Sequence, residues 1–144
     1  MKNPTPIVGI TLGDAAGIGP EVVAKALRHD AVRAVCRPVV IGDARVFSNP
    51  KFAADLGALE TVRSMADASF VKDRVTVLDM QNLDPKEFVM GIISIAAGRA
   101  AVEYVLKAAE LALSGAIDAV ATAPLNKEAM RRAGYPYIGH TEIL

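Results

Sequence analysis

Several residue types are scarce in this chain of 144 residues. It has one cysteine, Cys36, no tryptophan, and only two histidines, His29 and His140. A single cysteine excludes an internal disulfide and a metal site built from cysteines. Two histidines cannot supply a metal site that needs three. Aromatic residues make up only 5% of the chain, which argues against a platform for stacking nucleic-acid bases.

Neither sign of charge is in excess. The 16 basic and 16 acidic residues give a formal net charge of zero, so we expect no nucleic-acid and no membrane partner. The longest apolar run, about residues 88–98, is shorter than the ~18 residues that span a bilayer. No basic flank with an apolar core marks a secretion signal. We therefore expect a cytoplasmic enzyme or binding domain.

What the chain does contain is enough apolar surface for a packed core, since 52% of its residues are hydrophobic. Short apolar runs alternate with helical patterns, which predicts an α/β fold with a mostly parallel sheet. The predicted strands are 6–12, 38–41, 75–80 and 118–123. The predicted helices are 20–29, 94–114 and 127–133, with 44–68 helical in pieces.

The segment 94–114 has the clearest helical pattern. Its polar residues Arg99, Glu103, Lys107 and Glu110 form one stripe along an otherwise apolar, alanine-rich helix. Glu103 and Lys107 are spaced for an i,i+4 ion pair. Gly115 follows the last turn, as is common at helix ends.

A glycine-rich segment, Gly13–Glu21, lies between the first predicted strand and a helix that begins near Pro20. Its spacing, G-x-x-x-G-x-G, is neither a dinucleotide-binding fingerprint nor a P-loop. Two interpretations remain open. The segment either brings its backbone close to an anion at the helix N-terminus or is a tight turn without a ligand.

A second segment, Thr122–Glu128, follows the last predicted strand at the edge of the sheet where ligands bind in open parallel sheets. Asn126 and Lys127 would offer hydrogen-bond donors to a phosphate or carboxylate there. Alternatively, Asn126 caps the next helix and Lys127 is solvated. Asp43, at the end of another predicted strand, resembles the acidic residue that binds ribose in Rossmann folds. It lacks the matching glycine fingerprint, and we interpret it as part of a turn.

The third segment is Gly139–Glu142. Its histidine, His140, stands beside the hydroxyl of Thr141 and the carboxylate of Glu142, so it could bind an oxyanion, relay a proton or ligate a metal. Thr141 is also a possible N-cap for a helix that starts here. We expect residues 1–144 to be a single N-terminal portion of a longer domain, because the pattern stops at Leu144 as this helix begins.

These segments, in this order, resemble the 4-hydroxythreonine-4-phosphate dehydrogenase family of vitamin B6 biosynthesis. The matching stretches are Ile10–Glu21, Arg37–Asp43, Ala96–Val105, Asp118–Met130 and Gly139–Leu144. The family protein is more than twice this long, so the resemblance covers its N-terminal part. One departure is Ala15, where the family often has proline.

The resemblance implies a three-layer α/β/α fold like that of isocitrate and isopropylmalate dehydrogenases, a homodimer, NAD as oxidant and a divalent metal (zinc, magnesium or cobalt). The implied reaction oxidises the secondary alcohol of a small phosphorylated hydroxy acid and then decarboxylates the product, and 4-phosphooxy-L-threonine is the expected substrate. The family's Gly-His-Thr motif implies substrate contacts for His140 and Thr141. Its three metal-ligating histidines lie beyond Leu144, so none of the metal ligands is expected here.

Other functions stay open at this point. A paralogue acting on 4-phospho-D-threonate or its erythronate isomer would share these segments. A phosphate acyltransferase of similar fold would use the glycine-rich segment for phosphate. A non-catalytic binding or dimerisation module would need only this part of the chain, and we expect residues 1–144 alone to be inactive. The resemblance assigns no role to Asp14, Asn126 or Lys127.

Overall fold

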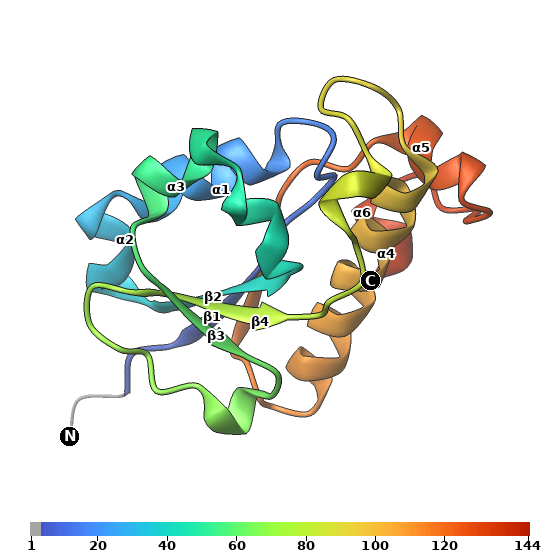
Figure 1. Ribbon diagram of the computed structural model, residues 1–144. Coiled ribbons are helices and arrows are strands. Elements are labelled where there is room, and N and C mark those ends of the chain that lie inside the picture. Colours follow the sequence, from blue (N-terminus) through green and yellow to red (C-terminus); the bar gives the residue numbers. More distant parts are fainter. Residues whose placement is uncertain (1–3) are drawn as a thin grey trace.

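The computed structural model describes residues 4–144 and contains one five-stranded sheet (Figure 1). The order of the strands is β3-β4-β2-β1-β5, and every neighbouring pair is parallel. The strands are β1 (Ile7–Thr11), β2 (Arg37–Gly42), β3 (Leu59–Val62), β4 (Val75–Asp79) and β5 (Ala119–Thr122). The predicted α/β fold with a parallel sheet is therefore confirmed.

Helices cover both faces of this sheet. The α-helices are α1 (Gly19–Leu27), α2 (Asp30–Val35), α3 (Pro50–Leu56), α4 (Ile95–Leu113), α5 (Lys127–Arg132) and α6 (His140–Ile143). The 3₁₀ helices are η1 (Ala44–Ser48), η2 (Met65–Asp67) and η3 (Pro85–Glu87). Figure 1 shows α1, α2 and α3 on one face and α4 on the other. Connections between parallel strands are right-handed, so the direction in which the chain moves along the sheet decides which face its helices cover. The chain moves toward the β3 edge from β1 to β3 and toward the β5 edge from β4 to β5.

The core lies around the central strands. Val39, Val40 and Ile41 of β2 are completely buried, and so is Val77 of β4, as expected for parallel strands covered on both faces. At the edge of the sheet, β5 is mostly exposed. Among residues 4–144, β5 pairs with β1 alone, so the other edge of this strand is open.

Helix α4 contacts β1, β2 and β5 and also packs against α5. The side chain of Ser94 caps it by accepting a hydrogen bond from the Ala97 N–H. The predicted Glu103–Lys107 pair is wrong, since Glu103 lies near Arg99 and Lys107 bonds Glu110. No helix within residues 4–144 is long and apolar enough to cross a membrane.

Two further differences concern short elements. The segment predicted to be helical in pieces, 44–68, contains strand β3 between α3 and η2. Glu60 in this strand accepts hydrogen bonds from the Ser69 N–H and the Thr76 hydroxyl, so tertiary contacts stabilise a strand that its own sequence does not favour. In addition, the structure contains the short helix α2, whose N-cap residue is His29.

Candidate functional site

Three segments meet at the edge of the sheet formed by the carboxyl ends of the strands. The Asp14 N–H, in the loop after β1, donates to the carbonyl oxygen of Pro124 over 2.9 Å. The Nε2 atom of His140, in α6, lies 3.1 Å from the carbonyl oxygen of Ala123. Consecutive carbonyls after β5 therefore hold together the glycine-rich segment and the Gly139–Glu142 segment, as ligand sites in open parallel sheets require.

The close approach of these loops depends on glycine. Gly13 has a φ of +72°, and a Cβ atom added there would lie 2.5 Å from the Pro124 carbonyl oxygen. A Cβ atom on Gly19 would lie 2.4 Å from the carbonyl oxygen of Leu12. Both distances are far inside van der Waals contact, so only glycine allows the backbone of this segment to fold back on itself.

The carboxylate of Asp14 stabilises the glycine-rich loop by accepting a hydrogen bond from a backbone N–H of the same loop. Asp14 is buried, its Oδ1 atom accepts the Ala16 N–H over 2.8 Å, and its carbonyl oxygen accepts the Gly17 N–H over 3.1 Å. Burial raises the pKa of Asp14, and the backbone N–H groups of Ala16 and Gly17 offset only part of that rise. The N–H groups of residues 14, 16 and 17 are all used inside the protein, which favours the tight-turn interpretation over an anion cradle made by these groups.

A hollow of about 160 Å³ opens beside this turn. It is lined by Asp14, Ala16, Gly17, Gly91, Ile92, Ile93 and Asn126. The Gly91 N–H donates to the carbonyl oxygen of Ala16 over 2.7 Å and holds the segment before α4 against the turn. The first and second segments singled out in the sequence thus share one small cavity, to which they contribute the polar side chains Asp14 and Asn126.

Asn126 and Lys127 adopt the helix-cap arrangement. The Oδ1 atom of Asn126 accepts the Ala129 N–H over 2.9 Å at the start of α5, and Lys127 is exposed. The capping interpretation is therefore confirmed. The amide nitrogen of Asn126 is not needed for the cap, so it can still donate a hydrogen bond toward the hollow.

His140 and Thr141 lie at the start of α6. His140 is half-buried and Thr141 is exposed. A carbonyl oxygen only accepts, so the contact with Ala123 requires the proton on Nε2 and leaves Nδ1 of the neutral ring as an acceptor. The prediction that Thr141 is the N-cap of this helix is wrong, because Gly139, two residues earlier, occupies that position. The Thr141 hydroxyl is not used in a cap.

Asp43 is part of a turn, as predicted, because it caps η1 through the Arg45 N–H, but its burial was not predicted. Its side chain is fully buried and accepts hydrogen bonds from the Leu83 N–H and from the Arg45 backbone and guanidinium. Burial alone would raise the pKa of Asp43, but the Arg45 side chain and these N–H groups outweigh it and hold the pKa below its ordinary value. The Asp43 N–H donates to the Tyr104 hydroxyl over 3.2 Å. Asp43 thereby ties β2, α4 and the loop after β4 together.

Metal ligands are not assembled in this part of the protein. Within residues 4–144, no three His, Cys, Asp or Glu side chains come close enough together to bind a metal ion. The described residues thus do not fit a metal centre of their own, and no chemical step is assigned to a metal held by them.

Comparisons with known proteins place this geometry in a family. The sequence profile of "Pyridoxal phosphate biosynthetic protein PdxA" matches residues 34–144. D-threonate 4-phosphate dehydrogenase of Cupriavidus necator is 42% identical over 145 residues, covering 100% of this chain. The crystal structure of 4-hydroxythreonine-4-phosphate dehydrogenase from Burkholderia phymatum superposes over 99% of the chain with 43% identity and a TM-score of 0.89. The enzyme of that name from Klebsiella pneumoniae superposes over 96% with 36% identity and a TM-score of 0.84.

These relatives are longer than the chain, which spans 43% of the length of each of them. The matches to these relatives nevertheless include the segments that meet at Ala123 and Pro124. The family profile begins after the glycine-rich segment and covers four of the five strands. On this similarity of sequence and fold, the chain belongs to the PdxA family of pyridoxal phosphate biosynthetic proteins.

Proposed function

We propose that this chain forms part of a dehydrogenase that oxidises the secondary alcohol of a small phosphorylated hydroxy acid. The relatives named above are dehydrogenases of 4-hydroxythreonine 4-phosphate or of D-threonate 4-phosphate. The observation that carries the proposal is the meeting of three sequence segments on the carbonyls of Ala123 and Pro124. This meeting places His140 at the sheet edge where α/β enzymes bind their ligands.

In this proposal His140 and Thr141 contact the substrate. The bond from Nε2 to the Ala123 carbonyl fixes the ring, and Nδ1 then accepts a hydrogen bond from a substrate hydroxyl. The exposed hydroxyl of Thr141 can donate to a carboxylate or phosphate oxygen. Because both residues lie on one short helix, a single movement of α6 would position them together.

The remaining parts of the activity are proposed for the whole protein. NAD would serve as the hydride acceptor. The divalent metal takes its ligands from outside residues 4–144, and the enzyme acts as a cytoplasmic homodimer. We propose 4-phosphooxy-L-threonine as substrate, with decarboxylation of the oxidised product. The name of the Cupriavidus relative makes D-threonate 4-phosphate the second candidate.

The test is an assay of NADH formation by the gene product that contains this chain, with each of the two phosphorylated acids. We expect one of them to be oxidised. His140→Gln should lower kcat/KM about ten- to a hundredfold, as expected for loss of a hydrogen bond to a charged substrate. His29→Gln is the matched control, because His29 lies at the start of α2 and is exposed.

The outcomes separate the alternatives. Absence of NADH with both acids, together with acyl phosphate formed from acyl-CoA and phosphate, would instead support an acyltransferase. Equal activity of His140→Gln and wild-type protein would overturn the role of His140. Equal losses in both histidine variants would point to a general loss of folding and would also remove the argument for His140.

A further inference from the structure

The hollow beside the glycine-rich turn has room for one six-membered ring. Its volume is about 160 Å³, and an apolar cavity of about 150 Å³ holds one benzene molecule. Small residues and backbone at Ala16, Gly17 and Gly91 line it together with two isoleucines, Ile92 and Ile93. A larger ligand would therefore place a single ring in this hollow and keep its other parts outside.

The two isoleucines are unusually exposed. Ile92 and Ile93 are 62% and 44% exposed, in a stretch that leaves Val89 and Ile95 more than half exposed as well. Large apolar side chains gathered at the surface mark interaction sites. Because Ile92 and Ile93 also line the hollow, they offer apolar surface to a ring that enters it.

The charge of the lining disfavours an anionic group. Asp14 is the one ionisable side chain among the seven lining residues, and no lysine, arginine or histidine is among them. A phosphate or carboxylate would lose water there without gaining a cation. The hollow therefore does not suit the ionic groups of a phosphorylated acid, whereas a neutral or positively charged ring is compatible with Asp14.

Asn126 supplies a hydrogen-bond donor that the fold does not use. Its Oδ1 atom accepts the Ala129 N–H, which fixes the orientation of the amide. Among residues 4–144, Nδ2 donates to no protein atom, and it is not enclosed, since the enclosed side-chain atoms without a partner there are Thr11 Oγ1 and Asn82 Oδ1. A ring that carries a carbonyl substituent could accept this hydrogen bond.

The fold alone does not explain Gly17. Its φ lies outside the left-handed region, and a Cβ atom added there would make only ordinary contacts, the nearest at 3.6 Å from the Asp14 carbonyl oxygen. Gly17 differs in this from Gly13, where the protein itself leaves no space. The absence of a side chain at Gly17 allows a ligand to approach the backbone closely.

The hollow adjoins His140 through the segment after β5. The Asp14 N–H donates to the Pro124 carbonyl, and His140 contacts the preceding carbonyl, of Ala123. Asn126 follows two residues after Pro124. A ring in the hollow would thus lie close to the ligand atoms that His140 contacts, as hydride transfer between two bound groups requires.

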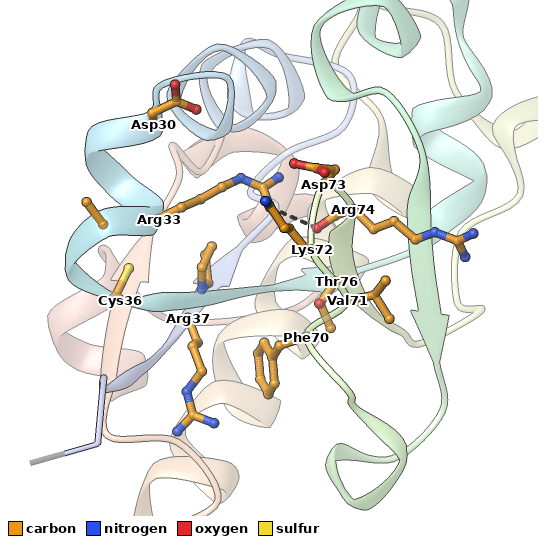
Figure 2. A pocket seen from close by; sticks show the side chains of 12 residues that line it. Asp30, Arg33, Cys36, Arg37, Phe70, Val71, Lys72, Asp73, Arg74 and Thr76 are labelled. Atoms are coloured by element: carbon orange, nitrogen blue, oxygen red, sulfur yellow. Dashed lines mark hydrogen bonds between the residues drawn. The ribbon is translucent and has the colours of Figure 1, made fainter.

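A larger hollow, of about 440 Å³, lies at the other ends of β2 and β4 (Figure 2). Its polar side chains do not converge, because the Arg37 guanidinium lies on the other side of β2 from Arg33 and Lys72. The Arg74 side chain points out of this hollow. It is also at the amino ends of these strands, away from His140, so it is not a place for the reacting groups.

We propose that the hollow beside the glycine-rich turn binds the nicotinamide ring of a dinucleotide cofactor, with Ile92 and Ile93 against the ring and Asn126 Nδ2 donating to its carboxamide oxygen. The oxidised ring carries a positive charge, which suits the acidic side chain of Asp14. The inference rests on the proposed dehydrogenase function and deepens it. It gives Asn126 a second role besides the cap of α5.

The test compares two nucleotides that differ by this ring. ADP-ribose has every part of NAD except the nicotinamide, so a contact with the ring affects NAD alone. The dissociation constants of both are measured by isothermal titration calorimetry with the gene product that contains this chain. Asn126→Ser keeps an oxygen for the cap of α5, since serine and asparagine cap about equally well, and removes the Nδ2 donor. We expect it to weaken NAD binding about tenfold and to leave ADP-ribose binding and the melting temperature unchanged.

A second pair of variants tests the apolar wall. Ile93→Ala should weaken NAD binding about three- to tenfold without changing ADP-ribose binding, because it removes apolar surface from the hollow. Ile95→Ala is the matched control. Ile95 is an exposed isoleucine two residues farther along the chain and is not part of the lining, so its loss should leave the binding of both nucleotides unchanged.

The outcomes are distinguishable. Asn126→Ser that binds NAD as wild type does, or that loses NAD and ADP-ribose equally, would overturn the role of Asn126. Equal effects of Ile93→Ala and Ile95→Ala would overturn the place of the ring. Either result in a protein that still forms NADH would leave the dehydrogenase proposal intact. Wild-type protein that binds neither nucleotide and forms no NADH would overturn both.

Discussion

The Nε2 atom of His140 is hydrogen-bonded to the main-chain carbonyl of Ala123, not to another side chain. The partner is thus a backbone atom immediately after β5, whose position is set by the parallel pairing of β5 with β1. The sheet therefore determines where the imidazole ring sits. A small movement of β5 would be transmitted directly to this ring.

Removing the ring should have little effect on folding. We expect His140→Ala to lower the free energy of unfolding by about 0.5–1.5 kcal/mol, the value of one hydrogen bond at a half-buried position. Ile143→Ala on the same helix should cost about 2–4 kcal/mol, because Ile143 is buried against Val102, Val105 and Met130. Urea denaturation measures both values. A larger loss for His140→Ala than for Ile143→Ala would show that His140 is mainly structural.

Gly13 can be tested against a glycine of similar conformation. We expect Gly13→Ala to destabilise the protein by about 1–3 kcal/mol more than Gly115→Ala, because only the first substitution adds a clash. Both residues have positive φ, +72° and +77°, but a Cβ on Gly115 meets nothing within 4 Å. Thermal unfolding of the two variants gives the comparison. Equal losses would mean that conformation alone, without the close approach to Pro124, explains the glycine.

The lowered pKa of Asp43 predicts a pH dependence. A carboxyl group whose pKa is lower in the folded state stabilises the fold above its unfolded pKa, near 3.8, and this stabilisation is lost as the pH falls through the folded value. Asp43→Asn should therefore cost about 1.5–3 kcal/mol at neutral pH. The difference from wild type should shrink as the pH falls below 3.8. A difference that does not change with pH would contradict an ionised Asp43.

The contribution of Asp14 to stability should change with pH in the opposite direction. Its pKa is raised by burial, so the folded protein holds the proton more tightly and loses stability as the pH rises from 3.8 through the folded pKa. Asp14→Asn keeps an oxygen acceptor for the Ala16 N–H and removes the buried charge. We expect this variant to equal wild type in acid and to be more stable at neutral pH. Urea titrations across this range test the sign, and lower stability at neutral pH would refute it.

The open edge of β5 predicts association of the 144-residue chain in isolation. Exposed strand edges pair with other chains, and a lysine on such an edge opposes this pairing. Ala121 is exposed on β5, so Ala121→Lys should reduce the growth of light scattering. Ala54→Lys adds the same charge at an exposed position of α3 and is the control. A monodisperse wild-type chain that melts cooperatively would refute the prediction.

Most of the fold could be predicted because its pattern is local. The strands at Ile7–Thr11 and Val75–Asp79 are short apolar runs, and α4 has a regular polar stripe with Ser94 as its cap. Strand β3 was missed, because its sequence contains Glu60, whose carboxylate is satisfied only by Ser69 and Thr76 farther along the chain. A pattern within four residues does not contain that information.

In the candidate site too, features that depend on nearby residues could be predicted and features that depend on distant residues could not. The positions of the glycine-rich segment, Asn126 and His140 at the ends of elements followed from sequence spacing. The burial of Asp43 did not, because its partners Leu83 and Tyr104 are 40 and 61 residues away.

The strand order has a consequence for synthesis on the ribosome. Strand β1 lies between β2 and β5, and the carboxylate of Asp118 accepts the Ile7 N–H across 111 positions of sequence. Strand β1 therefore lacks one neighbour until β5 emerges, roughly 80 residues after β2. At translation speeds of about 5–20 residues per second, that delay is about 4–16 seconds. During this interval the nascent chain carries an unpaired β1 edge, which a chaperone that binds extended apolar segments is suited to protect.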